Sequence, residues 1–194
     1  MENDMIKYLS KYVTVSKEVE TAIVESALIR TYEKGTILLK EGAFSNESFF
    51  VLKGCIRSYY LVDGIEKTNA FYTEEYVVTP FSYGKNIPSE CYLECTELTV
   101  ATVGTPSMET EMFKKYPELQ SVCLVLSEVL LSKNQKIFDN YIISSLEERY
   151  LALLSARPDL FQRVHQYQIA SYLGITAESF SRLRKRIAKK EIKN

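Results

Sequence analysis

The residues whose types and spacing best suit a chemical task lie in one short segment near the C-terminus, residues 166–186. If this segment ends in a helix, Glu178, Ser181 and Arg182 share an outward face with Ala177 and Lys185. Arg can donate two hydrogen bonds to guanine and Glu can accept one from cytosine, which favours the reading of bases in a DNA major groove. The alternative is a Glu178–Arg182 surface pair, which would contribute only about 0.2–0.5 kcal/mol.

The wider set of residues expected to contact DNA combines this face with polar and cationic neighbours suited to phosphate groups. The set is Gln166, Gln168, Thr176, Ala177, Glu178, Ser179, Ser181, Arg182, Arg184, Lys185 and Arg186.

Two short helices joined by a tight turn are expected to position these side chains. Gly174 supplies the positive φ of a sharp turn, and Thr176 is a natural N-cap for the helix that follows. Ile175 and Phe180 have the spacing of a hydrophobic staple across that cap. The inner faces are expected to comprise Ile169, Ala170 and Leu173 in the first helix and Phe180, Leu183 and Ile187 in the second. The segment therefore predicts a helix-turn-helix.

The distribution of charge is consistent with this prediction. The chain has 194 residues and a formal net charge of −1. Residues 1–146 carry 14 Lys and Arg against 20 Asp and Glu, whereas residues 147–194 carry 10 against 5. A basic module on an acidic body is the electrostatic footprint of a nucleic-acid reader, although a solvated basic surface would look the same.

The composition argues against several classes of protein. One histidine, His165, and four scattered cysteines provide no metal cluster and no set of nucleophile, base and orienting group, so we expect neither a metal site nor an enzyme. The longest apolar run, Val122 to Leu126, is far too short to span a membrane. The N-terminus lacks the apolar core of a signal peptide, which predicts a cytoplasmic protein with no membrane partner.

The first two thirds of the chain predict a β-rich body and a long helix. Residues 5–30 have helical spacing, with Ser16 as a plausible start, and residues 31–103 form short β-type runs separated by glycine. Asp63-Gly64 between two alternating runs predicts a hairpin, and the whole pattern predicts an antiparallel sandwich or barrel. A second, shorter helix is expected from Leu146 to Ser155, before Pro158.

The long amphipathic helix is expected to begin near Pro117, and its apolar stripe predicts a homodimer. The stripe comprises Leu119, Val122, Leu126, Val129, Leu130, Ile137 and Tyr141. A helix of this length on a small β domain commonly buries such a stripe against its twin. The alternative is that it only covers its own β domain.

The segment from Gln168 to Arg182 closely resembles the winged helix-turn-helix of the Crp/Fnr transcription regulators, and the order of elements matches over nearly the whole chain. The resemblance implies an α+β fold with an N-terminal antiparallel β-roll of the cyclic-nucleotide-binding type, a long dimerisation helix and a C-terminal winged helix-turn-helix. The implied domains are a sensory β-roll over residues 1–116, a dimerisation helix over 117–146 and a DNA-binding domain over 147–194, whose wing is expected to be short or absent.

The family resemblance also implies roles for individual residues. Glu178 and Arg182 match the family's base-reading Glu and Arg, and Ser179 matches a position that contacts the DNA backbone. Ala177 stands where the cAMP-responsive members carry another base-reading Arg, so a different operator sequence is expected. The implied partners are a two-fold symmetric DNA operator, a second copy of the chain and RNA polymerase.

The sensory half departs from the cAMP-binding pattern. Where those members use Gly-Glu and Arg-Ser, this chain has Val77-Val78 and Pro88-Ser89, and Glu90 follows. Lys85 lacks the bidentate fork of the missing arginine. We expect no cAMP binding and no cofactor, and neither the cysteine cluster of iron–sulfur members nor the axial ligands of haem members are present.

Two hypotheses remain for the β-roll. An unknown small effector could bind among Tyr60, Phe71, Tyr72, Phe81, Tyr83 and Ser89, or these aromatic residues are core and the roll is a scaffold. A rival function from another class is a small-molecule-binding adaptor whose C-terminal helices contact a protein partner.

Overall fold

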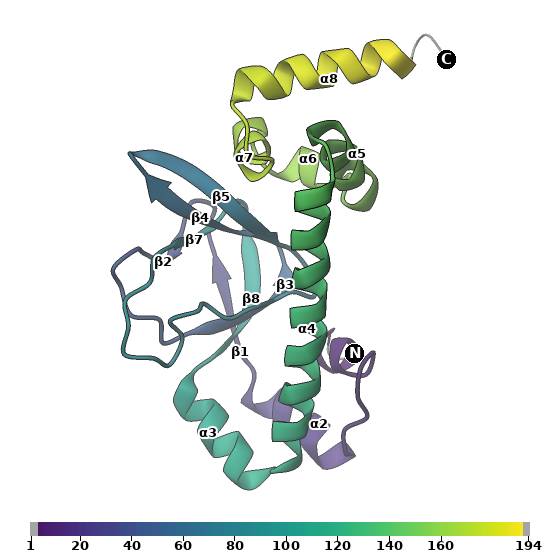
Figure 1. The fold of residues 1–194 in the computed structure, drawn as a ribbon. Coiled ribbons are helices and arrows are strands. Elements are labelled where there is room, and N and C mark those ends of the chain that lie inside the picture. The colour runs from purple at the N-terminus through teal and green to yellow at the C-terminus, as the bar shows by residue number, and fades with distance from the viewer. Residues whose placement is uncertain (1–3, 192–194) are drawn as a thin grey trace.

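The computed structural model describes residues 4–191 of the chain, and Figure 1 shows its two parts. A β-roll with short helices at one end lies beside a long helix, and a group of four helices lies at the far end of that helix. The strands are β1 (Leu28–Tyr32), β2 (Ile37–Leu39), β3 (Ser48–Lys53), β4 (Ile56–Val62), β5 (Ile65–Tyr72), β6 (Val77–Val78), β7 (Tyr92–Cys95) and β8 (Thr99–Gly104). The fold is therefore α+β, as the sequence predicts.

The β-roll consists of two antiparallel four-stranded sheets, with the strand orders β1-β8-β3-β6 and β2-β7-β4-β5. Side chains that alternate inward along β3, β7 and β8 fill the space between the sheets; Phe49, Val51, Leu93 and Val103 are all at most 2 % exposed. This burial supplies most of the apolar contact that holds the two sheets together.

The predicted hairpin is confirmed between β4 and β5. Val62 pairs with Ile65, which leaves Asp63 and Gly64 as a two-residue loop. Their φ angles are 51° and 76°, the pair of positive values that matches the twist of two antiparallel strands. The hairpin projects from the roll toward the C-terminal helices (Figure 1).

The N-terminal prediction was only partly right. Ser16 caps α2 (Lys17–Ser26), as expected, because its Oγ accepts a hydrogen bond from the backbone N–H of Val19 at 3.3 Å. The predicted single helix over residues 5–30 is wrong at both ends: a separate helix α1 (Asp4–Leu9) precedes α2, and Leu28 begins strand β1. Pairing of β1 with β8, in register from Leu28↔Val103, satisfies the backbone groups that a continued helix would have satisfied.

A short helix α3 (Pro106–Lys115) connects the roll to the long helix α4 (Glu118–Ile143), which is 26 residues long. The N-terminal part of α4 packs against its own chain. Leu119 and Val122 are 7 % and 5 % exposed, and Val122 lies in a cluster with α1 and Phe50. This packing corrects the expectation that Leu119 and Val122 lie in a dimer seam. Leu126 is also packed against this cluster.

A different apolar stripe of α4 is exposed. Leu124, Leu131 and Phe138 follow one another at seven-residue spacing and are 63 %, 69 % and 61 % exposed. Ile137 and Tyr141 of the predicted stripe are exposed as well, and Val129 and Leu130 are half-buried. The helix therefore has an inner face for its own β-roll and an unpaired outer face.

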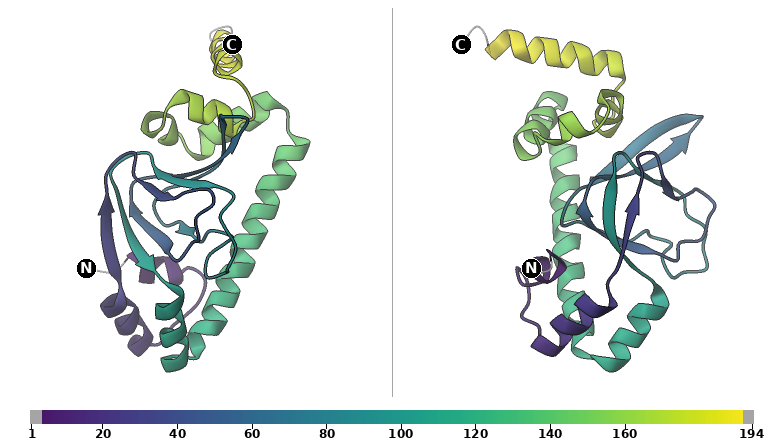
Figure 2. Two further views of the ribbon diagram at one scale, coloured as in Figure 1. Left: turned by 90° about the vertical axis from the view of Figure 1, so that its left-hand side faces the viewer. Right: turned by 180° about the vertical axis from the view of Figure 1, so that it is seen from behind.

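The C-terminal part is a bundle of α5 (Leu146–Ala156), α6 (Leu160–Arg163), α7 (Gln166–Tyr172) and α8 (Ala177–Glu191). Its core contains Leu160, Ile169 and Phe180, each at most 1 % exposed, together with Phe71 from the β-roll. The two views in Figure 2 show α8 as the outermost element, far from the N-terminal helices. No helix within residues 4–191 is long and apolar enough to cross a membrane. The expected short wing would follow α8, outside the described residues.

Candidate nucleic-acid interface

The predicted helix-turn-helix is formed by α7, a turn and α8. Gly174 has a φ of 76°, and the Oγ1 of Thr176 accepts a hydrogen bond from the backbone N–H of Ser179 at 3.2 Å. Both the turn glycine and the N-cap are therefore confirmed. Ile175 packs against the cluster that contains Phe180, which is the contact expected of a hydrophobic staple.

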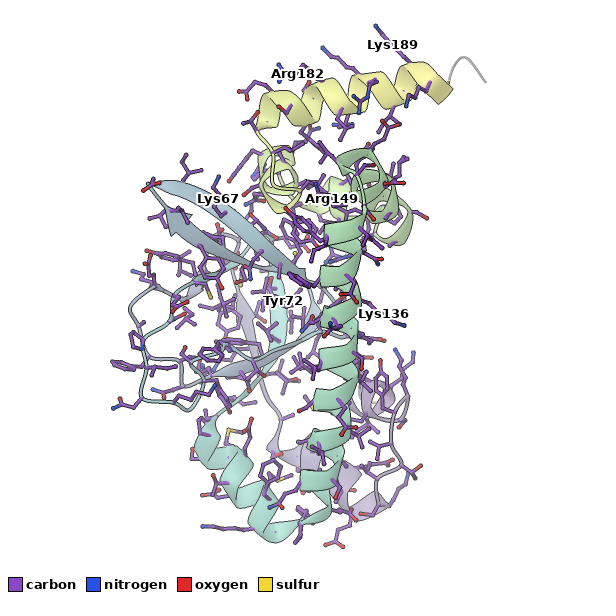
Figure 3. The ribbon with its side chains drawn as sticks, in the orientation of Figure 1. Lys67, Tyr72, Lys136, Arg149, Arg182 and Lys189 are labelled. Atoms are coloured by element: carbon purple, nitrogen blue, oxygen red, sulfur yellow. The ribbon has the colours of Figure 1, made fainter. Side chains whose placement is uncertain are left out.

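The two faces of α8 separate as the spacing predicts. Phe180, Leu183 and Ile187 are buried, at 1 %, 4 % and 7 % exposure. The outward side chains are those of Ala177, Glu178, Ser181, Arg182 and Lys185, all of which are exposed. Figure 3 labels Arg182 and Lys189 on the side of α8 that faces away from the body of the molecule. The exposed face is thus free to meet a large partner.

Cations dominate this outward surface. Arg182, Lys185, Arg186, Lys189 and Lys190 surround one shallow hollow along α8. The side chains of Arg186 and Lys190 contact α5, because both form ion pairs with Glu147, at 2.9 Å and 2.7 Å. Among the described residues, Lys185 and Lys189 form no ion pair, so they are available to a polyanion.

Glu178 and Arg182 do not contact one another directly in the described part of the chain. Arg182 donates to the Oγ of Ser179 at 3.0 Å, and no Glu178–Arg182 ion pair occurs in the described part of the chain. The pKa of Glu178 is lowered by the hydrogen bond from its own backbone N–H and then by Thr176, both at the start of α8. The carboxylate is therefore ionised and accessible, as an acceptor for a base would need to be.

One further surface contains residues that the sequence predicts to contact phosphate groups. Gln166, Ser181, Arg184 and Lys185 line a second hollow where the start of α7 meets α8. Arg184 lies over the ring of Phe180, with 5.9 Å between the guanidinium carbon and the ring centroid, and forms no ion pair within residues 4–191. These four residues belong to the set that the sequence predicts to contact DNA, and the structure brings them together.

Gln168 does not lie on the exposed surface, contrary to the prediction from the sequence. Its side chain is 3 % exposed, and its Oε1 accepts a hydrogen bond from the backbone N–H of His165 at 3.1 Å. Gln168 closes a capping box at the start of α7 and has no open face. The expected DNA contact at this position is therefore wrong, because the side chain satisfies a helix terminus instead.

The helix-turn-helix docks directly on the β4–β5 hairpin of its own chain. The Oγ of Ser171 in α7 donates to the carbonyl of Glu66 at 2.8 Å and accepts from the N–H of Thr68 at 2.9 Å. The rings of Phe71 and Tyr172 lie 5.6 Å apart beside this contact. The position of α7 is thus tied to the β-roll.

Arg163 at the end of α6 makes a second connection between the two parts. Its guanidinium donates to Glu97 at 2.6 Å, to Glu74 at 2.8 Å and to the carbonyl of Gly54 at 2.8 Å. These bonds join three separate loops of the β-roll to the C-terminal helical bundle. Arg163 could not be identified from the sequence, because nothing in the local pattern of α6 distinguishes it from a surface arginine.

The ion pairs of this second connection change the pKa values of Glu74 and Arg163. Burial pushes the pKa of Glu74 upward, but hydrogen bonds from Arg163 and from the backbone N–H groups of Glu74 and Gly54 outweigh it and lower the pKa below 4.5. The hydrogen bonds that Arg163 donates to Glu74, and then to Glu97 and Asp159, in turn raise the pKa of Arg163. Glu74 is therefore ionised at neutral pH and supports the junction electrostatically.

The aromatic residues expected around a ligand do not line one cavity. Phe71 is 3 % exposed and belongs to the core of the C-terminal bundle, whereas Phe81 is 80 % exposed, with the ammonium of Lys85 3.9 Å from its ring centroid. Burial raises the pKa of Tyr72 to about 12, and Tyr60 lies half-exposed on β4. This dispersion corrects the expectation of a single aromatic pocket, because Phe71 packs into the C-terminal bundle whereas Phe81 is exposed to solvent.

The positions that correspond to the cAMP cassette are occupied by structural contacts. Val78 is 3 % exposed in the core of the roll, and the Oγ of Ser89 donates to the carbonyl of Cys91 at 2.9 Å. Ser89, expected at a ligand, is itself only 5 % exposed. Its hydroxyl serves a turn rather than an open site.

One buried cation of the roll was not anticipated. Arg57 is 1 % exposed and forms ion pairs with Glu94 at 2.6 Å and with Glu66 at 2.7 Å. Burial pushes the pKa of Arg57 down, but the hydrogen bonds to Glu94 and Glu66 outweigh it and raise the pKa. Since two carboxylates already compensate its charge, Arg57 is not free to hold a phosphate.

Comparison with known proteins places this arrangement among solved structures. No protein-family model matches the chain, and no curated protein matches it. FixK2 from Bradyrhizobium japonicum is 19 % identical, with 86 % of each chain covered and a TM-score of 0.67. The c-di-GMP-responsive global regulator CLP of Xanthomonas campestris is 16 % identical, with 91 % of this chain and 93 % of that chain covered and a TM-score of 0.67.

A CooA mutant from Carboxydothermus hydrogenoformans extends the comparison to nearly the whole chain. The two chains are 18 % identical, and the match covers 98 % of this chain and 86 % of the CooA chain, with a TM-score of 0.63. These structural neighbours are Crp/Fnr-family regulators with a cyclic-nucleotide-binding-like fold. The chain therefore has the fold that the sequence resemblance predicts, including the order of β-roll, long helix and helix-turn-helix.

Proposed function

We propose that this chain, which has the fold of the Crp/Fnr regulators, is a sequence-specific DNA-binding transcription regulator. In this proposal α8 is the recognition helix, and its amino-terminal half enters the major groove. Glu178 and Arg182 read base edges, while Lys185 and Arg184 contact phosphates.

The observation that carries the proposal is the outward face of α8. Its apolar side is fully used by the bundle core, and its other side presents Glu178, Ser181, Arg182 and Lys185 to solvent. Cations along one exposed helix face favour a polyanionic partner, and the ionised Glu178 among them favours base discrimination over simple charge attraction. A protein partner would more often meet an apolar patch than five cations around one hollow.

The active form in this proposal is a homodimer on a palindromic operator. The exposed stripe of Leu124, Leu131 and Phe138 supports a coiled-coil seam between two copies of α4, because seven-residue spacing keeps such residues facing the partner helix. Two recognition helices would then enter successive major grooves roughly 34 Å apart. The symmetry of the operator would reflect the two-fold axis of the dimer.

The proposal assigns no catalytic step, cofactor or cAMP site to the chain, and it places the protein in the cytoplasm. RNA polymerase is a further proposed partner at promoter DNA. Loss of the cAMP-binding residues is supported by the buried Val78 and the structural hydrogen bond of Ser89. An effector of the β-roll, if the regulator has one, would have to be of a different chemistry.

Selection from a randomised duplex library tests the proposal. The purified full chain is incubated with the library with and without cAMP, and the retained DNA is sequenced. We expect the same palindrome to be enriched in both arms, and the affinity for that palindrome to fall steeply as salt concentration rises. A matched selection with the Arg182→Ala variant should lose base preference within each half-site.

Three results would contradict parts of this proposal. Enrichment only in the presence of cAMP would overturn the conclusion about Val78 and Ser89. Enrichment of a single, asymmetric site would argue against the dimer. Duplex binding that is absent at every salt concentration would favour the adaptor function, in which the C-terminal helices contact a protein.

A further inference from the structure

A mostly apolar groove lies at the end of the molecule opposite α8. It is bounded by the sheet β1-β8-β3-β6 on one side and by α1, α2, α3 and the start of α4 on the other, and its volume is about 280 Å³. Its walls include Leu9, Phe50, Met112, Leu119, Val122 and Leu126. The helices α2 and α3 and the start of α4 lie together in the lower half of Figure 1, far from the helix-turn-helix. The groove is distinct from the aromatic pocket that the sequence predicts.

The groove has one polar end, built around Gly104. A Cβ at Gly104 would lie 2.8 Å from the Oγ of Ser48 and 4.0 Å from Oε1 of Glu109, so the missing side chain leaves space beside both oxygen atoms. Glu109 Oε1 accepts a hydrogen bond from the hydroxyl of Tyr83 at 2.8 Å. Ser48, Gly104 and Glu109 all line the groove. Its polar end therefore consists of the hydroxyl oxygen of Ser48 and the carboxylate of Glu109.

Among the described residues, no cation balances this carboxylate. Within residues 4–191, Glu109 forms no ion pair, and the residues that line the groove include no Lys or Arg. A carboxylate at the end of an apolar groove complements a positively charged or hydrogen-bond-donating group and repels an anion. The charge of the site thus selects one kind of head group.

We propose that this groove is a binding site for a small apolar amine, whose hydrocarbon part lies between α3, α4 and β3 and whose ammonium contacts Glu109 and Ser48. The volume suits a chain of about eight carbon atoms or one substituted aromatic ring. Met108 and Met112, on one wall, have unbranched side chains that adapt to ligands of different shape. Tyr83 orients the carboxylate and does not enter the groove itself.

Three ligands with the same hydrocarbon part test the head-group preference. Calorimetric titration of the full chain, without DNA, compares octylamine, octanol and octanoate at neutral pH. We expect octylamine to bind at least about tenfold more tightly than octanoate, with octanol between them, because only the ammonium gains a charge-assisted hydrogen bond.

Two variants with a matched control locate the site. Glu109→Gln should reduce the affinity for octylamine about tenfold and leave that for octanol nearly unchanged, since the variant removes only the charge. Glu111→Gln, an exposed residue two positions along α3, removes the same charge outside the groove and should have no effect. Met112→Trp should weaken the binding of octylamine and octanol alike, because the larger ring fills the apolar space.

Equal affinity for all three ligands would overturn the proposal, since it would indicate unspecific association with apolar surface. An unchanged affinity for octylamine in Glu109→Gln would also overturn the proposal. The same holds if the protein is a dimer that does not bind octylamine because the second copy covers the groove. If Glu109→Gln fails to fold, the order of the three ligands on the unaltered chain still decides the matter. The titrations contain no DNA, so failure of the proposed regulator function leaves this test intact.

Discussion

The hydroxyl of Ser171 in α7 bridges the backbone of β5 on either side of Lys67, donating to the carbonyl of Glu66 at 2.8 Å and accepting from the N–H of Thr68 at 2.9 Å. Strand β5 is the edge of its sheet, so these backbone groups have no strand neighbour on that side. One side chain of the helix-turn-helix thus takes the place of a neighbouring strand. Figure 3 labels Lys67 on the hairpin below α7, where this contact lies.

Removal of this hydroxyl should loosen the junction. Ser171→Ala leaves the N–H of the buried Thr68 and the carbonyl of Glu66 without their partner, which should lower the free energy of unfolding by about 1–2 kcal/mol. Urea unfolding followed by circular dichroism measures the change. Ser127→Ala, at an exposed serine of α4, is the control and should shift the midpoint little. Equal losses in both variants would show that the bridge contributes nothing to stability.

The connection made by Arg163 should make stability depend on acid pH. The pKa of Glu74 is lower in the folded chain than its ordinary 4.5, so the unfolded chain takes up a proton first as pH falls. The stabilisation is fully present above pH 4.5 and is lost as pH falls through the lower, folded value. Unfolding measured between about pH 6 and about pH 3 should show a shallower loss for Glu74→Gln than for the unaltered chain.

The control for this pH dependence is Glu111→Gln, an exposed carboxylate of α3. It should retain the full acid sensitivity of the unaltered chain. If Glu74→Gln and Glu111→Gln follow the same curve, the ion pair between Glu74 and Arg163 does not control the acid limb of stability.

The helix-turn-helix could be predicted from the sequence because its determinants are local. The turn needs a positive φ, which Gly174 provides, and the N-cap needs a short oxygen-bearing side chain, which Thr176 provides. The hairpin at Asp63 and Gly64 follows for the same reason. In each case the residues that fix the geometry lie within a few positions of one another.

The junction between the two parts could not be predicted in this way. Arg163 reaches Gly54 across 109 positions of the chain, and Ser171 reaches Thr68 across 103. Neither residue type nor spacing identifies such partners, since they exist only after both parts have folded. Gln168 was misassigned for a related reason: a polar residue near a recognition helix looks accessible until its burial in a helix cap is known.

The long helix shows a different limit of sequence analysis. Leu119, Val122 and Leu126 on one side and Leu124, Leu131 and Phe138 on the other are both apolar series. Periodicity predicts that each series forms a stripe, but it cannot tell which stripe meets the β-roll. Packing against α1 and Phe50 decides the question for the first series.

Base reading by α8 predicts a difference between two neighbouring variants. Arg182→Ala should weaken binding to the selected operator by about 1–3 kcal/mol and leave binding to random duplex less affected, because the guanidinium is expected at a base edge. Lys185→Ala should weaken both kinds of DNA to a similar extent and reduce the slope of the salt dependence. Fluorescence anisotropy at several salt concentrations measures both effects. Equal losses on operator and random DNA for Arg182→Ala would refute its base-reading role.

Dimerisation through the outer face of α4 predicts that Leu131→Glu separates the two copies. Leu131 is 69 % exposed in the single chain, so the new carboxylate should not disturb the fold, whereas a seam would have to bury it. We expect the dissociation constant of the dimer, measured by sedimentation equilibrium, to rise at least about a hundredfold, equivalent to about 2.7 kcal/mol. Ser132→Glu adds the same charge about 100° around the helix and should leave the dimer intact. A Leu131→Glu chain that sediments as the unaltered protein does would place the contact between copies elsewhere, because no helix seam tolerates two unpaired carboxylates at its centre.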